Sequence, residues 1–351
     1  MNWAEEYGIV ANPDILSEEF IPEHIFARDV QIRELRFCLS PILKRRKPTH
    51  AWLHGRSGTG KTTIAKYILE KIQLEAHIRG TYVNCWEKNT FYAILQEILN
   101  NLRALCTEER NTGLKLEQVR KQINDDFFVL ILDEIDTLPL RERNATLYNL
   151  SNVGNIGIIC IGENELPLLT LEDRVKSRLN PQVIPFPQYA INDLVGILRQ
   201  RAEMGLVPDA WSHKILEGIA GSSQGEARIA ICTLRSAANF AERDYSKFIE
   251  NRHIEKAFNN LKDLKRLYAL KSLTEHHQIL YHLIRNSKEI ISKDLWKRYL
   301  ERCQEDKLIP VAKRTFDHYL SQLDRLRLIE SKRARVRGKV HLYKIAHPEE
   351  G

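Results

Sequence analysis

Hydrophobic and polar residues alternate along residues 50–186 in a pattern that predicts short strands separated by helices. Stretches with helical spacing, such as residues 61–74 and 90–105, lie between short apolar runs. Alternation of strands and helices is typical of a parallel sheet covered by helices. We therefore expect an α/β fold in this part of the chain. The predicted strands are residues 50–54, 80–84, 127–132, 156–161 and 183–186.

The pattern changes twice after this region. Residues 191–260 show helical spacing only, which predicts a small helical domain. Apolar spacing then predicts three helices, followed by two β-like stretches, within residues 272–346. Three helices closed by a β-hairpin form a winged helix, a variant of helix-turn-helix. The predicted helices are residues 274–286, 292–302 and 312–326, and the β-stretches are 328–332 and 339–345. The predicted domains are residues 1–188, 189–261 and 262–351.

Composition excludes several classes of protein. Apolar residues make up 43% of the chain, too many for a disordered protein. No apolar run approaches the ~20 residues of a membrane helix, and the first ten residues lack the basic segment of a secretory signal. The cysteines form no CxxC pair, and adjacent His276 and His277 are expected at the surface rather than at a metal site. We expect a cytoplasmic protein without a membrane partner.

The basic charge of the chain is concentrated near its end. The formal net charge is +7, yet residues 262–351 contain 21 Lys and Arg against 12 Asp and Glu. The other 261 residues contain 32 against 34. Such asymmetry indicates a nucleic acid or an acidic membrane surface as the partner of the C-terminal part.

Residues 55–62 match the phosphate-binding motif GxxxxGK[ST] in full. The motif follows an apolar strand and opens a helix, which is the context that it requires. Its glycines let backbone N–H groups approach phosphate oxygens, and the helix N-terminus adds partial positive charge. We expect Lys61 to reach the β- and γ-phosphates of ATP and Thr62 to bind Mg²⁺. The predicted nucleotide-binding residues of this loop are Gly55, Arg56, Ser57, Gly58, Thr59, Gly60, Lys61, Thr62 and Thr63.

Asp133 and Glu134 follow a fully apolar strand. Because ligands of α/β proteins bind at the carboxyl ends of the strands, this strand is expected to bring both acids to the nucleotide. Asp133 is predicted to bind Mg²⁺ through its water shell. Glu134 is predicted to act as the general base on the attacking water. An acidic turn without function is the alternative interpretation, and the upstream phosphate-binding motif weighs against it.

The next predicted strand ends at Ile161 and is followed by Gly162, Glu163 and Asn164. A side-chain amide at this place can hydrogen-bond the γ-phosphate or orient the attacking water. An isolated asparagine is more often a turn residue. The position of Asn164, after the strand that follows the Asp-Glu strand, favours the functional interpretation, so Asn164 is a predicted catalytic residue.

Together, the phosphate-binding loop, Asp133 to Asp136, Asn164, the helical domain and the winged helix resemble the AAA+ ATPases. More narrowly, the chain from about Phe20 to Tyr343 resembles archaeal replication initiators of the origin-recognition-complex and cell-division-cycle type. The resemblance implies a P-loop parallel sheet with a helical lid, followed by a winged-helix DNA-binding domain. It also implies ATP hydrolysis, with ATP or ADP and Mg²⁺ as cofactors.

The same resemblance assigns residues that the motifs alone do not. Residues 20–32 look like the family's N-terminal segment that packs against adenine, which implies nucleotide contacts for Ile25 and Arg28, and for Tyr189 before the lid. The stretch from Trp86 to Tyr92 falls where initiators insert a short helix that touches DNA.

Two arginines are assigned in this way. Residues 174–178 resemble the family's box with an arginine finger, and Arg178 is our predicted finger. Residues 225–228 resemble the lid motif whose arginine contacts the γ-phosphate, which is Arg228 here. A guanidinium suits both roles because it is always charged and can bond two phosphate oxygens. The alternative interpretation is that Arg178 is a solvated charged residue on the surface of a helix.

The helix predicted over residues 312–326 is expected to be the recognition helix of the winged helix. Lys313 and Arg314 are predicted to meet DNA phosphates, and Thr315, Asp317 and His318 to face the groove. Alternating basic residues on the following hairpin repel one another unless a polyanion is near. The alternative is that these residues are a solvated strand edge. The basic charge and the predicted fold both favour contact with DNA instead. The basic residues of the hairpin are Arg333, Arg335, Arg337 and Lys339.

The resemblance implies a DNA replication initiator that binds origin-like duplex DNA under ATP control and helps to recruit or load the replicative helicase. It also implies self-association, or association with a paralogue, on DNA in the nucleoid. Two alternatives stay open from the sequence. One is an AAA+ ATPase that selects target DNA for a transposase, and the other is a transcriptional regulator that uses ATP only as a binding switch.

Overall fold

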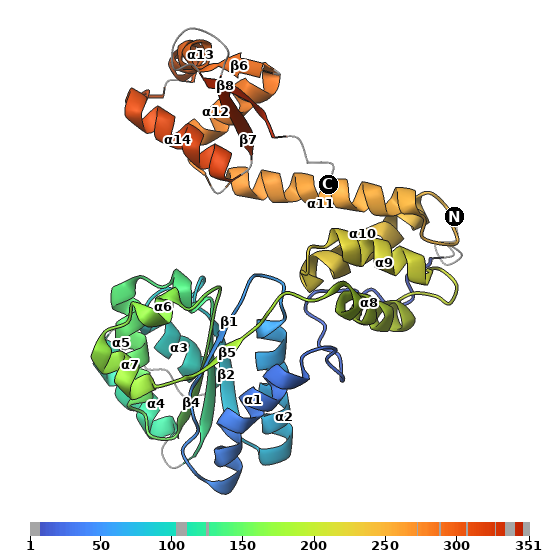
Figure 1. The fold of residues 1–351 in the computed structure, drawn as a ribbon. Coiled ribbons are helices and arrows are strands. Elements are labelled where there is room, and N and C mark those ends of the chain that lie inside the picture. The colour runs from blue at the N-terminus through green and yellow to red at the C-terminus, as the bar shows by residue number, and fades with distance from the viewer. Residues whose placement is uncertain are drawn as a thin grey trace, which may run out of the picture. The chain divides into compact units, whose positions relative to one another are not determined.

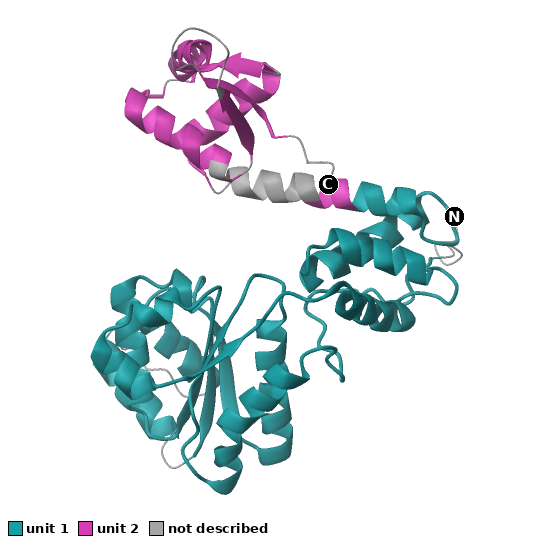
Figure 2. Cartoon of the chain, in the orientation of Figure 1, with its two compact units in different colours: residues 1–257 teal, residues 258–351 magenta. Residues whose placement is uncertain are grey.

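The structure is a computed structural model, and it describes residues 8–102, 111–123, 126–271, 273–287, 289–306, 308–326, 328–333 and 341–346 (Figure 1). The chain divides into two compact units (Figure 2). Unit 1 comprises residues 1–257 and unit 2 comprises residues 258–351. The boundary predicted at residue 188 lies inside unit 1 and stays a prediction.

Unit 1 contains a parallel sheet of five strands in the order β2–β3–β4–β1–β5. Each strand lies within one residue of its predicted bounds. β3 and β4 are buried along their whole length, as expected for inner strands of a sheet covered on both faces. The strands are β1 (Ala51–His54), β2 (Arg79–Asn84), β3 (Phe128–Asp133), β4 (Ile156–Gly162) and β5 (Gln182–Pro185).

Helices cover both faces of this sheet (Figure 1). Because side chains alternate between the faces of a strand, Ile131 packs with Ile64 on one face, whereas Leu130 packs with Ile94 on the other. The first face is covered by α1 (Asp29–Leu39), the 3₁₀ helix η1 (Ser40–Lys44) and α2 (Lys61–Ala76). The second face is covered by α3 (Phe91–Asn101), α4 (Thr112–Ile123), α5 (Leu140–Ser151) and α7 (Asp173–Leu179). The short helices η2 (Ile135–Thr137) and α6 (Leu166–Leu169) follow β3 and β4.

A group of helices follows the sheet, as the apolar spacing predicts. It consists of α8 (Ile191–Gly205), α9 (His213–Ser222), α10 (Ala227–Arg243) and the start of α11 (Asn251–Lys271). The N-terminal residues lie against α8: Val10 forms a bridge with Leu206, and the buried Arg201 guanidinium donates to the carbonyls of Ile15 and Phe20 at 2.6 and 2.8 Å. This contact fixes the N-terminal segment beside the cavity described below.

Unit 2 begins within α11 and contains the helices α12, α13 and α14 and a three-stranded sheet in the order β6–β8–β7. Its core includes Leu280, Tyr299, Phe316 and Leu323, all buried. Among the helices that the structure describes in either unit, none is long and apolar enough to cross a membrane. The elements are α12 (Glu275–Asn286), β6 (Glu289–Ile291), α13 (Ser292–Glu305), α14 (Lys313–Arg325), β7 (Ile329–Arg333) and β8 (His341–Ile345).

Three local expectations differ from the structure. The sheet of unit 2 has the additional strand β6, which is too short to give a period-2 pattern. Residues 86–90 are not helical, and α3 begins at Phe91, so the expected inserted helix is not formed there. The surface position expected for His277 is wrong: its ring is 3% exposed and Nε2 lies 2.7 Å from the Gln322 Oε1 atom of α14.

Candidate functional site

The phosphate-binding loop connects the end of β1 to the start of α2. Gly58 and Gly60 have φ angles of +72° and +90°, a region that favours glycine. A Cβ atom on Gly60 would lie 2.7 Å from the Tyr189 hydroxyl. Glycine at this position therefore allows the left-handed turn of the loop. It also leaves room for the side chain of Tyr189, which lies just before the lid. The helix N-terminus then faces a cavity of about 710 Å³.

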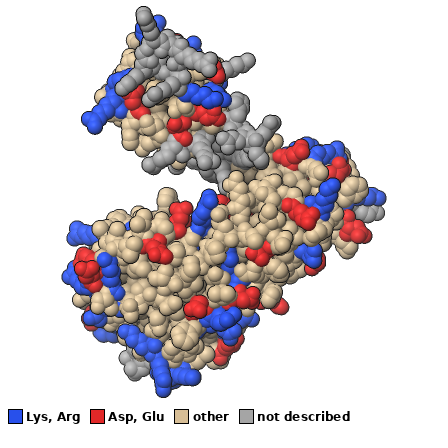
Figure 3. All heavy atoms as spheres, viewed as in Figure 1, with Lys and Arg blue, Asp and Glu red and all other residues tan. Residues whose placement is uncertain are grey.

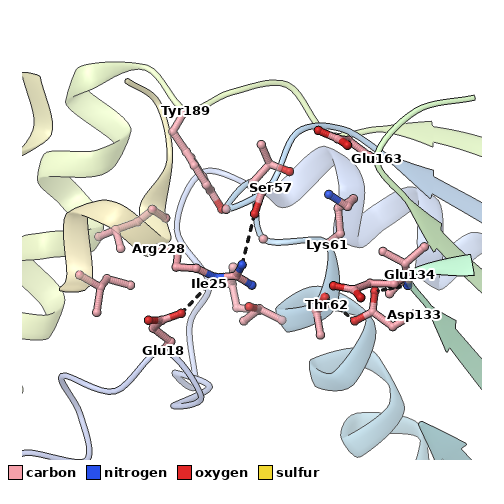
Figure 4. Close-up of a pocket in the computed structure, with 18 of the residues that line it drawn as sticks. Glu18, Ile25, Ser57, Lys61, Thr62, Asp133, Glu134, Glu163, Tyr189 and Arg228 are labelled. Carbon is pink, nitrogen blue, oxygen red and sulfur yellow. Dashed lines mark hydrogen bonds and ion pairs between the residues drawn. The ribbon is translucent and has the colours of Figure 1, made fainter. Parts of the chain in front are cut away.

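Lys61 is the first residue of α2 and lies inside the cavity (Figure 4). Its ammonium group donates to the carbonyls of Gly55 and Arg56 at 2.5 and 3.0 Å. Burial lowers the pKa of Lys61, and the carboxylates of Asp133, Asp136 and Glu163 oppose that shift. The side chain is thus a cation in a site otherwise rich in acids.

Thr62 and Asp133 form an oxygen cluster that fits a hard divalent cation. The Thr62 hydroxyl donates to Asp133 Oδ2 at 2.7 Å, and the Tyr82 hydroxyl lies 3.0 Å from the same oxygen. Asp133 is 5% exposed at the end of the buried strand β3. Carboxylate and hydroxyl oxygens are the donor types that Mg²⁺ binds. These oxygens therefore fit the predicted Mg²⁺ site, where they would bind the ion either directly or through water.

Glu134 follows Asp133 and lines the same cavity. Its φ of +53° ends the strand abruptly, and its N–H donates to Asp133 Oδ1 at 2.9 Å. Burial raises the pKa of Glu134, and the carboxylates of Asp133 and Asp136 raise it further. A carboxylate with a raised pKa is a stronger base toward water, which suits the predicted role.

Hydrophobic and aromatic residues border the cavity on the side of the N-terminal segment and the lid. Ile25 and Tyr189, the predicted nucleotide contacts, line it (Figure 4). Arg28 is buried behind the loop, where it donates to the carbonyls of Thr59 and Pro187 at 3.0 and 2.7 Å. Its guanidinium lies 3.6 Å from the centre of the Tyr189 ring. Arg28 thus positions the loop and Tyr189, and the described cavity lining does not include it.

The lid contributes Arg228 from the first turn of α10. Its guanidinium lies 3.2 Å from the Ser57 hydroxyl of the phosphate-binding loop and 3.0 Å from a Glu18 oxygen (Figure 4). Arg228 therefore connects lid, loop and N-terminal segment in one place. Ser57, Gly58, Thr59, Gly60, Thr62 and Thr63 also line the cavity, whereas Gly55 and Arg56 are not among the described lining residues.

Two neighbouring residues after β4 are placed differently. Glu163 lines the cavity, whereas Asn164 is not one of the described lining residues. The Asn164 Oδ1 atom accepts the N–H of Leu166 at 2.9 Å, at the start of α6. The sequence predicts a role for the amide of Asn164. It assigns no role to three other carboxylates that line the cavity, those of Glu18, Asp136 and Glu163.

Three family models match consecutive parts of the chain. They are described as an AAA domain, over residues 44–169, a Cdc6 AAA+ ATPase-type lid domain, over residues 195–259, and a CDC6 C-terminal winged helix domain, over residues 268–351. ORC1-type DNA replication protein 1 of Halobacterium salinarum is 32% identical to the chain over 305 residues, which cover 85% of this chain and 98% of that protein. The chain belongs to the family of ORC1-type DNA replication proteins.

Solved structures of related proteins have the same fold as this chain. The Aeropyrum pernix ORC1 protein in complex with DNA superposes with a TM-score of 0.82 at 25% identity, covering 97% of this chain and 94% of that one. Cdc6p from Pyrobaculum aerophilum has the same fold, with a TM-score of 0.66 at 23% identity, and covers 97% of this chain and 95% of that one. The predicted AAA+ sheet, helical lid and winged helix are confirmed.

The predicted arginine finger of this ORC1-type chain lies on α7. Arg174 and Arg178 are both exposed, and their guanidinium groups lie 5.4 and 5.7 Å from the centre of the Tyr148 ring. Arg174 also pairs with Glu172 at 2.6 Å. Neither arginine is among the described residues that line the cavity of its own unit.

In unit 2, the predicted DNA contacts fall on α14 and the hairpin. Arg314 and His318 are exposed and lie four residues apart, on one side of the helix, whereas Thr315 is half-buried. Lys313 pairs with Asp317 at 3.3 Å and lies over Phe316, 4.1 Å from its ring centre. Arg333 ends β7. The other predicted hairpin residues, Arg335, Arg337 and Lys339, lie outside the described residues.

Proposed function

We propose that this chain is an ATP-hydrolysing replication initiator that binds origin duplex DNA under nucleotide control. The observation that carries the proposal is the cavity of unit 1, where Lys61, Thr62, Asp133 and Glu134 converge at one end of the sheet. Membership of the ORC1-type family supports replication as the process.

ATP binding follows from the groups around the phosphate-binding loop. Backbone N–H groups of the loop and the start of α2 bond the phosphates, and Lys61 moves from the carbonyls of Gly55 and Arg56 to the β- and γ-phosphate oxygens. Thr62 and Asp133 hold Mg²⁺, which neutralises phosphate charge when it is bound. Ile25 and Tyr189 enclose the base of the nucleotide.

Hydrolysis requires a base and additional positive charge. Glu134 accepts the proton of the attacking water, and Arg228 donates to the γ-phosphate from the lid. Asn164 is the group that its position after β4 and the analogy with other NTPases assign to the γ-phosphate or the water. Arg178 of a neighbouring molecule completes the charge around the γ-phosphate, so hydrolysis depends on self-association or on a paralogue bound beside this chain.

DNA binding is assigned to unit 2. Its support is the winged-helix family match, the DNA complex of the Aeropyrum relative, and the exposed Arg314 and His318 of α14. The basic hairpin sequence, with Arg333, Arg335, Arg337 and Lys339, adds charge for phosphate contacts. Bound at an origin in the nucleoid, the ATP form helps to recruit or load the replicative helicase, and hydrolysis resets it.

Genome-wide mapping of the DNA that the protein protects in cells tests this function. We expect a few sharp sites that coincide with the places where replication starts, and loss of helicase at these sites when the protein is depleted. Protection at transposon target sites or at promoters, without any link to replication starts, would contradict the proposal and favour one of the two rival functions.

A further inference from the structure

Glu163 is a charged residue of the cavity to which no motif assigns a role. It follows β4 at the carboxyl edge of the sheet and lies on the same side of the cavity as Lys61 (Figure 4). Its N–H donates to Asp136 Oδ2 at 3.0 Å, and its carbonyl accepts the N–H of Gly55 at 3.1 Å. These two hydrogen bonds fix the backbone of Glu163 between the phosphate-binding loop and the acidic turn after β3.

Asn164 is engaged elsewhere. Its side-chain oxygen accepts the N–H of Leu166 and completes the turn into α6, a local use of asparagine that leaves this acceptor occupied. The side chain after β4 that lines the cavity is therefore a carboxylate and not an amide. The two groups differ in charge, and a carboxylate has no N–H with which to bond a phosphate.

The end of the cavity beside β3 and β4 contains more acids than bases. Of the described residues there, four carboxylates, those of Asp133, Glu134, Asp136 and Glu163, line the cavity. Lys61 is the cation among them, and Arg228 on the lid side is already paired with Glu18 at 3.0 Å. Mg²⁺ bound at Asp133 offsets part of this excess, but Glu163 lies beyond that oxygen cluster on the loop after the next strand.

The two nucleotides differ by one phosphate at this same end. The lysine of a P-loop reaches the β- and γ-phosphates, so the γ-phosphate of ATP lies in the part of the cavity around Lys61. A fixed negative charge there opposes the γ-phosphate more strongly than the β-phosphate, because Coulomb repulsion falls with distance.

We propose that Glu163 sets the nucleotide preference of this site: its carboxylate faces the position of the γ-phosphate and makes the cavity favour ADP over ATP. The inference rests on the proposed function only in requiring that the cavity bind nucleotide. Its consequence is a built-in bias toward the ADP form. The ATP form that acts on DNA is then reached only when Mg²⁺ or a neighbouring molecule supplies positive charge.

Isothermal titration of the full chain with ADP and with a non-hydrolysable ATP analogue, each with and without Mg²⁺, tests the inference. Glu163→Gln keeps the size of the side chain and removes its charge. We expect this variant to raise the ratio of ATP-analogue to ADP affinity by roughly tenfold, the scale of a unit-charge interaction across a partly hydrated site. The increase should be larger without Mg²⁺, because the metal neutralises part of the phosphate charge.

One variant serves as a control, and a second tests the neighbouring residue. Glu75→Gln makes the same change of charge at an exposed position in the last turns of α2, so the affinity ratio should stay within about twofold of wild type. Asn164→Ala removes the amide that is predicted to reach the γ-phosphate and preserves the charge of Glu163.

Several results would overturn the inference. An unchanged ratio in Glu163→Gln would show that the carboxylate does not act on the γ-phosphate. Weaker binding of the ATP analogue only in the presence of Mg²⁺ would make Glu163 a metal ligand instead. A changed ratio in Asn164→Ala alone would assign the role to the amide.

The design separates this inference from the proposed function. If wild type binds neither nucleotide, both fail. If wild type binds both nucleotides and Lys61→Ala binds neither, the nucleotide site stands, and the affinity ratio of Glu163→Gln then decides the role of Glu163 by itself.

Discussion

The cavity of unit 1 and the basic C-terminal sequence of unit 2 differ in the way that we propose they bind phosphates. Unit 1 has no excess of basic charge: it contains 32 Lys and Arg against 34 Asp and Glu, and both signs are interspersed on the face that Figure 3 shows. Unit 2 contains 21 Lys and Arg against 12 Asp and Glu. The cavity therefore depends on single groups at fixed positions, and the C-terminal unit depends on the density of charge.

The difference has a physical origin. A nucleotide presents two or three phosphates in one place, so each donor must lie within hydrogen-bond distance, and no other residue replaces it. A DNA backbone repeats its charge along the duplex, so any lysine or arginine near it contributes. Substitutions should thus have large individual effects in unit 1 and small, additive effects in unit 2.

The largest effect is expected for Lys61→Ala. The variant loses charge-assisted hydrogen bonds to two phosphates, so ATP affinity should fall by roughly 10³-fold or more, and hydrolysis should disappear with it. Isothermal titration with ATP measures this effect. Equal affinity of wild type and variant would refute the assignment of the nucleotide site.

Arg178→Ala tests whether a neighbouring molecule completes the site. Nucleotide binding by the monomer should be unchanged, whereas hydrolysis that rises with protein concentration, or on DNA, should fall by about 10³-fold, as for other arginine fingers. Arg174→Ala is the matched control on α7. Loss of hydrolysis in Arg174→Ala but not in Arg178→Ala would assign the role to Arg174. If the hydrolysis rate per molecule never depends on protein concentration or on DNA, the arginine finger loses its support.

Glu134→Gln should separate binding from chemistry. The amide keeps the shape of the side chain but accepts no proton, so hydrolysis should fall by about 10²- to 10³-fold while ATP affinity stays within a few-fold. A phosphate-release assay alongside the ATP titration checks both parts. Wild-type turnover in this variant would exclude Glu134 as the base.

The smallest effects are expected on α14. His318→Ala should change the preference among DNA sequences by about 1–3 kcal/mol at one base pair and leave the salt dependence almost unchanged, because base edges give specificity and phosphates give position. Thr315 is half-buried, so Thr315→Ala should have less effect on sequence preference. Binding of a randomised duplex library, followed by sequencing, measures these preferences. A uniform loss across all sequences would mean that His318 contacts only the backbone.

The sequence predicts unit 1 well because its motifs are local. Strong apolar runs define β3 and β4, and a complete P-loop motif defines Lys61 and Thr62, so the sheet and the oxygen cluster of Thr62 and Asp133 both follow from short segments. Glu18 could not be found in this way, since it reaches Arg228 from a segment without regular pattern. Glu163 could have been recognised as the residue directly after β4, but choosing between it and Asn164 requires the turn into α6.

Unit 2 shows where the patterns are weaker. The helices α12 to α14 have a clear amphipathic period, which predicts them. The strand β6 has three residues, too few for alternation to be visible. The sequence wrongly predicts His277 at the surface, because a polar residue can be buried when it forms a hydrogen bond with another helix. Its partner here is Gln322, which lies 45 residues away in sequence.

The most direct test of the comparison is the salt dependence of DNA affinity, measured by fluorescence anisotropy on a labelled duplex. Wild type should show a steep linear fall of log affinity with log salt concentration. In the double variant Arg335→Ala and Arg337→Ala, affinity should fall on all sequences, and the slope should flatten by up to about two units, near 0.9 for each lost phosphate contact. Nucleotide affinity should be unchanged. An unaltered slope and affinity would contradict the account, because the basic hairpin would then be a solvated edge.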